Sequence, residues 1–183
     1  KLNSEKQKKE INKLINKYYE IFGYQQLTGI IEKQFIKISE IYPENKMEFM
    51  KIKYIEKNFS NRVIIMDEVH VTRESGSGSN LDNKKSRPYL EMIARYGKNN
   101  KLILLTATPM YNITSEIVWL LNLLLWNDRR GPIEKYKVFK KNGLTLLDEE
   151  ILIEKSRGYI SYLRGENPIT FPFKLDPPEK DTY

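Results

Sequence analysis

The sequence predicts an α/β fold built on a parallel sheet with flanking helices. Two short apolar runs, residues 63–66 (VIIM) and 102–105 (LILL), are typical of strands that are buried on both faces. Between them, a helical pattern begins near Pro88 and ends at Gly97. Strand, helix and strand in this order favour a right-handed parallel crossover. The carboxyl ends of the two strands are therefore expected to lie side by side.

Residues 1–60 are predicted to be a helical or mixed α/β N-terminal part of the chain. Within residues 1–22, apolar side chains recur at helical spacing and lysines occupy the other surfaces, which predicts an amphipathic helix. A second helical period follows Gly23 and closes at Pro43. Residues 47–59 fit either a helix or a strand.

Residues 61–127 are predicted to form the core of the domain, and residues 128–183 a helical extension with a proline-rich tail. The nearly continuous apolar run 117–126 predicts a buried helix, and a further helix is expected around 146–155. Residues 72–88, rich in Gly, Ser and charge, are expected to form a mobile surface loop.

The composition limits the classes of protein to be considered. With 183 residues, of which 40% are hydrophobic, the chain can bury one sizeable core, so one domain is expected. Its net charge of +7 suits a polyanionic partner, although a solvated lysine-rich surface explains the charge as well. The absence of cysteine excludes disulfides and thiolate metal sites and fits an intracellular, reducing compartment.

Two further features concern the relation of the chain to a membrane and to a longer protein. The longest apolar run, 117–126, is far shorter than the roughly 20 residues that a membrane-spanning helix needs, so no membrane crossing is expected. The chain begins at Lys1 inside a helical pattern, so we expect it to be a segment of a longer protein.

Asp67 and Glu68 directly follow the first predicted strand, where open α/β sheets bind their ligands. Asp67 can hold Mg²⁺ directly or through water, and Glu68 can polarise the water that attacks a γ-phosphate. For the dipeptide alone, two solvated acids at a strand end are the simpler explanation. The second strand is followed by Thr106 and Thr108. If the two strand ends are neighbours, their hydroxyls can reach Glu68 and His70. For these threonines alone, a threonine-rich turn is the simpler explanation.

Taken together, DEVH and TATP resemble motifs II and III of superfamily-two helicases and translocases, because their order, spacing and strand context agree. The resemblance implies a partial RecA-like sheet and the use of ATP or another NTP with Mg²⁺. It also implies nucleic acid, DNA or RNA, as the partner. The residue roles that it implies are Mg²⁺ binding by Asp67, activation of water by Glu68, and coupling of hydrolysis to movement by His70, Thr106, Ala107 and Thr108.

A closer resemblance covers residues from about 23 to 178. The segments 22–35, 61–70, 102–130 and 156–177 resemble helicases of nucleocytoplasmic large DNA viruses, which are related to the poxvirus early transcription factor small subunit and the transcription-termination NTPase. The RGENP-x-TFP signature within the last segment is absent from plain DExH helicases. This resemblance implies work in viral transcription, with viral RNA polymerase or transcription factors as partners, in the virion or the host cytoplasm.

The sequence departs from the family pattern in two ways. It has no G-x-x-x-x-G-K-[ST] phosphate-binding loop, known as Walker A, and no second motor lobe. We therefore expect no efficient ATP hydrolysis by these residues alone. Basic and aromatic residues beyond the core can line a nucleic-acid track. They can instead be helix-capping residues and residues at the edge of the core. The arginines among them are Arg129, Arg130, Arg157 and Arg164.

Two other functions are compatible with parts of the pattern. A non-catalytic lobe that docks on nucleic acid or polymerase has no chemical need for DEVH or TATP, but the missing phosphate-binding loop keeps this alternative open. An unrelated P-loop NTPase, such as a transporter ATPase, is disfavoured because such proteins lack the combination of TATP and RGENP.

Overall fold

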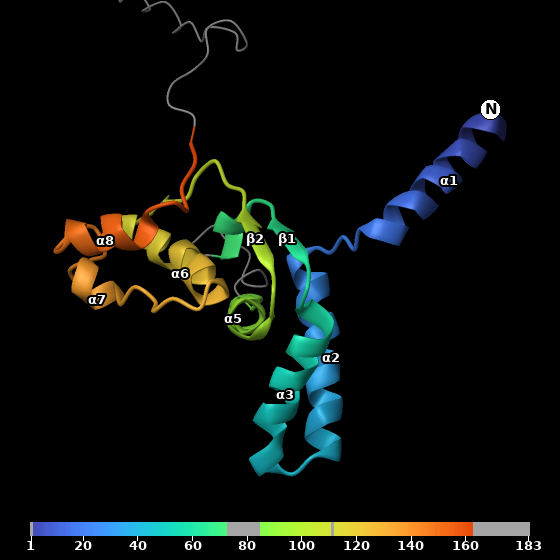
Figure 1. The fold of residues 1–183 in the computed structure, drawn as a ribbon, viewed down its shortest axis with the longest axis horizontal. Coiled ribbons are helices and arrows are strands. Elements are labelled where there is room, and N and C mark those ends of the chain that lie inside the picture. The colour runs from blue at the N-terminus through green and yellow to red at the C-terminus, as the bar shows by residue number, and fades with distance from the viewer. Residues whose placement is uncertain (1, 73–84, 111, 163–183) are drawn as a thin grey trace, which may run out of the picture.

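The computed structural model describes residues 2–72, 85–110 and 112–162, with residues 2–4 described by their backbone alone (Figure 1). The expected α/β class is confirmed as a small parallel sheet accompanied mostly by helices. Most of the expected surface loop, and the chain from residue 163 onward with Arg164, the RGENP signature and the proline-rich tail, lie outside the described residues.

The sheet has two parallel strands, β1 (Val63–Met66) and β2 (Lys101–Leu104), paired so that Val63 lies opposite Lys101 and Met66 opposite Leu104. Its hydrogen bonding extends one residue further at the carboxyl end, where the N–H of Leu105 donates to the carbonyl of Met66 at 2.9 Å. The predicted parallel pairing is thus confirmed, and the chain segments that follow the two strands leave the same edge.

The first three helices are α1 (Leu2–Tyr18), α2 (Tyr24–Ile41) and α3 (Glu44–Phe59). The segment that fitted either a helix or a strand is therefore helical. Figure 1 shows α2 and α3 side by side as a hairpin, with α1 projecting away from the rest of the fold. None of the helices among the described residues combines the length and apolarity that crossing a membrane requires.

The remaining elements follow the predicted order. The helix between the strands and the apolar helix after β2 are confirmed, the latter preceded by a short 3-10 turn. The elements are η1 (Val69–Thr72), α5 (Arg87–Tyr96), η2 (Thr114–Glu116), α6 (Ile117–Asn127), α7 (Lys135–Val138) and α8 (Glu149–Ser156).

Helices α5 and α6 cover one face of the sheet. Met66 from β1 is buried in a cluster with Leu90 and Ala94 of α5 and Trp119 and Leu123 of α6. Burying a side chain of this size contributes roughly 1.5–3 kcal/mol. This face of the sheet therefore holds the strands firmly against α5 and α6.

The opposite face of the sheet differs from the prediction of strands buried on both faces. Val63 is 65% exposed, Ile65 58% and Ile103 43%. Side chains alternate across a strand, so these residues share the face away from α5 and α6. No helix among the described residues covers that face, and the apolar runs are consequently only half buried.

Two smaller clusters attach the outer helices. Ile31 of α2, Ile55 of α3 and Ile93 of α5 are buried together, which fastens the α2–α3 hairpin to the sheet domain. On the other side of α6, Leu121 and Leu125 pack against residues of the C-terminal extension. The core thus continues from the N-terminal helices into the extension.

Candidate active site

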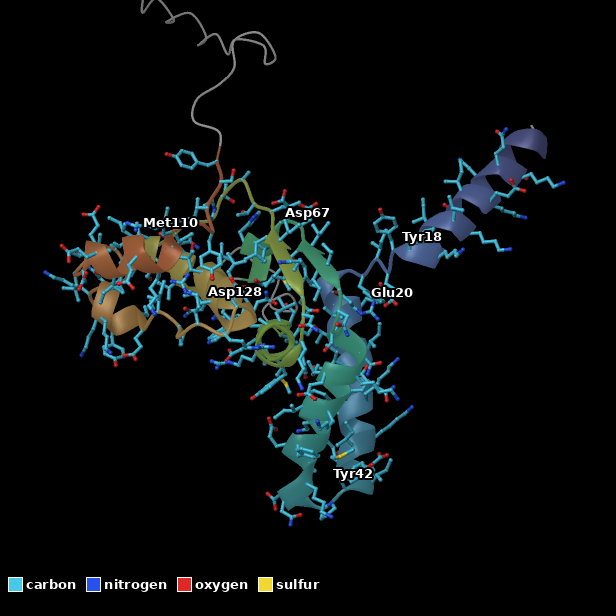
Figure 2. All side chains as sticks on the ribbon, viewed as in Figure 1. Tyr18, Glu20, Tyr42, Asp67, Met110 and Asp128 are labelled. Carbon is cyan, nitrogen blue, oxygen red and sulfur yellow. The ribbon has the colours of Figure 1, made fainter. Side chains whose placement is uncertain are left out.

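The acidic pair lies at the carboxyl edge of the sheet. Asp67 and Glu68 follow β1 directly, and Thr106 follows β2 by two residues. Figure 2 shows Asp67 at this end of β1, whereas Tyr42 marks the distant tip of the α2–α3 hairpin. Both carboxylate residues are exposed, in the position where ligands bind to open parallel sheets.

The turn that carries the two acids has an uncommon backbone conformation. Glu68 has a φ of 49°, in the left-handed region that non-glycine residues seldom adopt. Its backbone N–H donates to Oδ1 of Asp67 at 3.0 Å, so the first carboxylate supports the turn that presents the second. Such conformations persist where the surroundings hold them and are frequent at functional sites.

His70 joins the acidic turn to the end of the neighbouring strand. Its Nδ1 lies 3.1 Å from Oε2 of Glu68 and 2.9 Å from Oγ1 of Thr106. A carboxylate only accepts hydrogen bonds, so the Glu68 contact requires a proton on Nδ1. His70 is more buried than Glu68, since their side chains are 20% and 60% exposed, so the imidazole is the fixed partner and the carboxylate the accessible one.

The TATP segment contributes chiefly through Thr106. Oγ1 of Thr106, besides contacting His70, accepts a 3.1 Å hydrogen bond from the backbone N–H of Thr108. Ala107 and the side chain of Thr108 are exposed. The structure therefore brings Glu68, His70 and Thr106 into one chain of contacts, and Thr108 joins it through its backbone.

The donor set suits Mg²⁺ bound with few protein ligands. Among the described residues, no cluster of three or more His, Cys, Asp or Glu side chains could enclose a metal ion. Mg²⁺ usually takes one or two carboxylates and completes its shell with water and substrate phosphates. One exposed carboxylate at a strand end, Asp67, with Glu68 beside it, fits that mode of binding.

Tyr24 also belongs to this site, although the sequence analysis assigned it no role. Its hydroxyl donates a 2.8 Å hydrogen bond to the backbone carbonyl of Asp67. Burial, together with the nearby charges of Asp67 and Glu68, raises the pKa of the Tyr24 phenol to about 12. No local pattern indicated this contact, because it joins residues 43 positions apart in the chain.

Two of the four arginines proposed for a nucleic-acid track, Arg129 and Arg130, have local partners. The guanidinium of Arg129 donates to backbone carbonyls at the end of α5, among them those of Ala94 and Gly97, which is the capping arrangement. Arg130 lies 5.4 Å from the ring centroid of Tyr159. Arg157 is exposed just after α8, and Arg164 lies outside the described residues.

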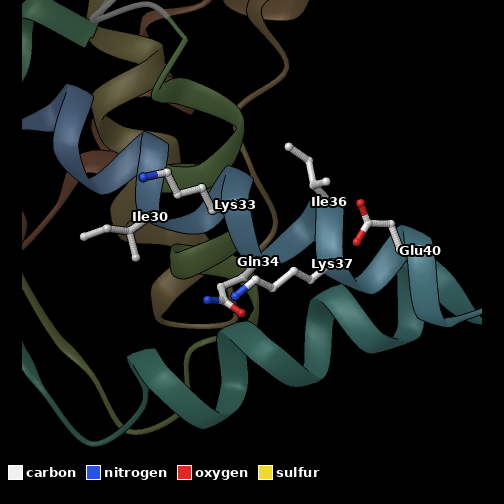
Figure 3. A pocket seen from close by; sticks show the side chains of 6 residues that line it. All are labelled: Ile30, Lys33, Gln34, Ile36, Lys37 and Glu40. Carbon is white, nitrogen blue, oxygen red and sulfur yellow. The ribbon is translucent and has the colours of Figure 1, made fainter.

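A separate hollow of about 430 Å³ lies on the outer side of α2 (Figure 3). Its lining residues, which include Ile30, Lys33 and Ile36, all come from that helix, and none belongs to the acidic turn. Its one carboxylate is that of Glu40, and neither Asp67 nor Glu68 lines it, so we do not place the chemistry there.

The chain is similar to viral proteins that are named as helicases. Two proteins of Acanthamoeba polyphaga mimivirus, each named "Putative ATP-dependent RNA helicase", are 29% identical over 180 residues and 27% identical over 166 residues. These alignments cover 89% and 86% of this chain. A protein of Frog virus 3 (isolate Goorha) named "Putative helicase" is 35% identical over 120 residues, or 65% of this chain.

The chain spans only 15%, 24% and 12%, respectively, of the length of these three relatives. No protein-family model matches the sequence, and no solved structure matches it. The similarities support a relationship with a family of viral proteins that are named as helicases.

Proposed function

We propose that this chain forms part of the first motor lobe of an ATP-dependent viral helicase or translocase, and that NTP hydrolysis takes place at its DEVH turn. The observation that carries the proposal is the contact chain from Glu68 through His70 to Thr106. It joins an exposed carboxylate at the end of one parallel strand to a hydroxyl at the end of its neighbour. A pair of merely solvated acids has no need of such a link.

The two carboxylates have different tasks in this proposal. Asp67 holds Mg²⁺, which when bound neutralises charge on the phosphate oxygens. Glu68 orients the attacking water and accepts its proton. The hydrogen bond from the Glu68 N–H to Oδ1 of Asp67 keeps both carboxylates on one rigid turn, so that their separation is set before a nucleotide binds.

His70 and the TATP segment couple the site to nucleic acid. A change in the position of Glu68 is transmitted through His70 Nδ1 to Thr106, and from Thr106 to the Thr108 backbone. Ala107 and Thr108 follow in an exposed segment that can contact a partner. Hydrolysis and movement are thereby connected through three polar contacts, those of Glu68 with His70, His70 with Thr106, and Thr106 with the backbone of Thr108.

The phosphate-binding loop comes from another part of the parent protein. Two observations support this step: the sequence contains no G-x-x-x-x-G-K-[ST] motif, and the relatives are several times longer than this chain. The exposed apolar face of the sheet, with Val63, Ile65 and Ile103, is a suitable packing surface for that additional part.

The track is DNA or RNA. The names of the mimivirus relatives favour RNA, and the family resemblance favours a role in viral transcription together with RNA polymerase or transcription factors. The exposed apolar sheet face also fits a second function, that of a non-catalytic docking module, since such a face suits a protein partner.

The test is ATP hydrolysis by the complete parent protein, with and without single-stranded RNA or DNA. We expect nucleic acid to stimulate turnover, and Glu68→Gln to decrease turnover by orders of magnitude while nucleotide binding is retained. Glu91→Gln is the matched control, because it removes a carboxylate that pairs with Arg95 at 2.6 Å on the surface of α5. This variant is expected to keep normal turnover.

The results separate the two functions. Near-normal turnover in Glu68→Gln would refute the role of Glu68. A well-folded parent protein without any turnover, but with measurable binding to nucleic acid or polymerase, would favour the docking module instead.

A further inference from the structure

Tyr24 reaches the acidic turn from a helix that the reaction does not otherwise involve. It is the first residue of α2, and its ring packs against the buried cluster that contains Met66 and Val69, one residue before and one residue after the acidic pair. Leu27, one helical turn further on, packs against the same cluster. The Tyr24 hydroxyl is thus held by a helix and a core, and not by a loop.

The carbonyl that Tyr24 contacts belongs to the peptide group between Asp67 and Glu68. The Tyr24 hydroxyl donates to the oxygen of this peptide at 2.8 Å, and the N–H of the same peptide donates to Oδ1 of Asp67 at 3.0 Å. Both polar groups of a single planar unit are therefore bonded. Rotation of this peptide plane would break both hydrogen bonds together.

The orientation of this peptide plane determines the conformation of the acidic turn. Rotating it changes ψ of Asp67 and φ of Glu68, and φ of Glu68 has the uncommon value of 49°. An interaction that opposes this rotation keeps Glu68 in the left-handed conformation, from which its side chain contacts His70 at 3.1 Å.

We propose that Tyr24 is a positioning residue, whose hydroxyl acts through the Asp67 carbonyl to hold both carboxylates in their working orientation. The proposal rests on the function proposed above for the acidic turn. Tyr24 touches neither the nucleotide nor the reacting water in this arrangement. Because Tyr24 belongs to α2, the orientation of the two carboxylates also depends on the position of α2 relative to β1.

Tyr24→Phe tests the proposal, because it removes the hydroxyl and keeps the packed ring. The matched control is Tyr89→Phe, which removes a similar phenol that donates to Oε1 of Glu32 at 3.1 Å. Amide hydrogen exchange at Glu68 and Val69 is measured in this chain. Exchange there is expected to be roughly five-fold faster in Tyr24→Phe, the effect of one net hydrogen bond, and unchanged in the control.

Steady-state turnover is then measured in the complete parent protein. For Tyr24→Phe we expect kcat to fall by roughly five-fold, again the effect of one hydrogen bond, while KM for ATP stays unchanged. A purely structural role would instead lower the fraction of folded protein, and the apparent kcat would fall only in proportion to that fraction. A rise in KM at constant kcat would overturn the positioning role, as would unchanged exchange at Glu68.

The outcomes also distinguish this proposal from the one on which it rests. If wild-type turnover is lost in Glu68→Gln but unaffected in Tyr24→Phe, the role of Tyr24 is refuted and the motor function stands. If the parent protein has no turnover at all, the motor function is refuted, and the exchange measurement alone decides whether Tyr24 holds the turn.

Discussion

Gly97, which ends α5, occupies a space that a larger residue cannot enter. A Cβ atom at this position would lie 2.3 Å from Nδ2 of Asn100, 2.7 Å from the carbonyl oxygen of Ile93 and 2.8 Å from that of Phe59. The two carbonyls belong to the backbone and cannot rotate away. We therefore expect Gly97→Ala to displace the end of α5 from the starts of both strands.

The loss of stability expected for Gly97→Ala follows from the contacts that this substitution must change. The Asn100 amide donates to the carbonyl of Phe59 at 2.7 Å and accepts from the N–H of Arg62 at 3.1 Å, which ties the two strand starts together. Loss of these two hydrogen bonds costs about 2 kcal/mol. Overpacking against fixed backbone atoms adds about 1–3 kcal/mol. Gly97→Ala is thus expected to lower the free energy of unfolding by at least about 3 kcal/mol.

Urea unfolding followed by tryptophan fluorescence measures this change. Gly29→Ala is the matched control, because Gly29 lies inside α2 with nothing within 4 Å of its Cβ position. That substitution should stabilise the protein by up to about 1 kcal/mol, through the higher helix propensity of alanine. If Gly97→Ala unfolded within about 0.5 kcal/mol of the wild type, a difference typical of neutral surface changes, the reasoning from these contacts would be refuted.

Three further predictions concern other parts of the fold. Gly143 has a φ of 69° and its Cβ position lies 2.6 Å from Oγ of Ser115, so Gly143→Ala should lower the free energy of unfolding by about 2 kcal/mol; an unchanged urea midpoint would contradict this. Arg129→Lys should cost about 1–2 kcal/mol, because an ammonium group cannot reproduce the forked contacts with the carbonyls at the end of α5; full retention of stability would show that the cap is dispensable. Burial, with the hydrogen bond to Glu32, raises the pKa of the Tyr89 phenol from 10.0 to about 12. The folded protein therefore holds this proton more tightly than the unfolded chain, so its contribution to stability is complete below pH 10 and is lost as the pH rises from 10 through 12. Tyr89→Phe should flatten that alkaline loss in a series of unfolding curves, and an identical loss in both proteins would disprove the assignment.

Much of the local structure followed from sequence periodicity. The helices on either side of Gly23 and the two strands were predictable because an amphipathic repeat or an apolar run depends on neighbouring residues alone. The parallel pairing of β1 with β2 was also predictable, since a helix of sufficient length lies between them. Residues 47–59 remained undecided, because their apolar spacing suits both periods; packing of Ile55 against α2 and α5 selects the helix.

The sequence by itself thus determined the order of the elements and the position of Asp67 and Glu68 after a strand. Only the tertiary structure decided which residues meet there. The contact of His70 with Thr106 spans 36 positions and that of Tyr24 with Asp67 spans 43, and no periodic pattern records contacts at such separations. The sequence likewise did not indicate that one face of the sheet is exposed. An apolar run shows that a strand can be buried on both faces, but its actual burial depends on which elements pack against it.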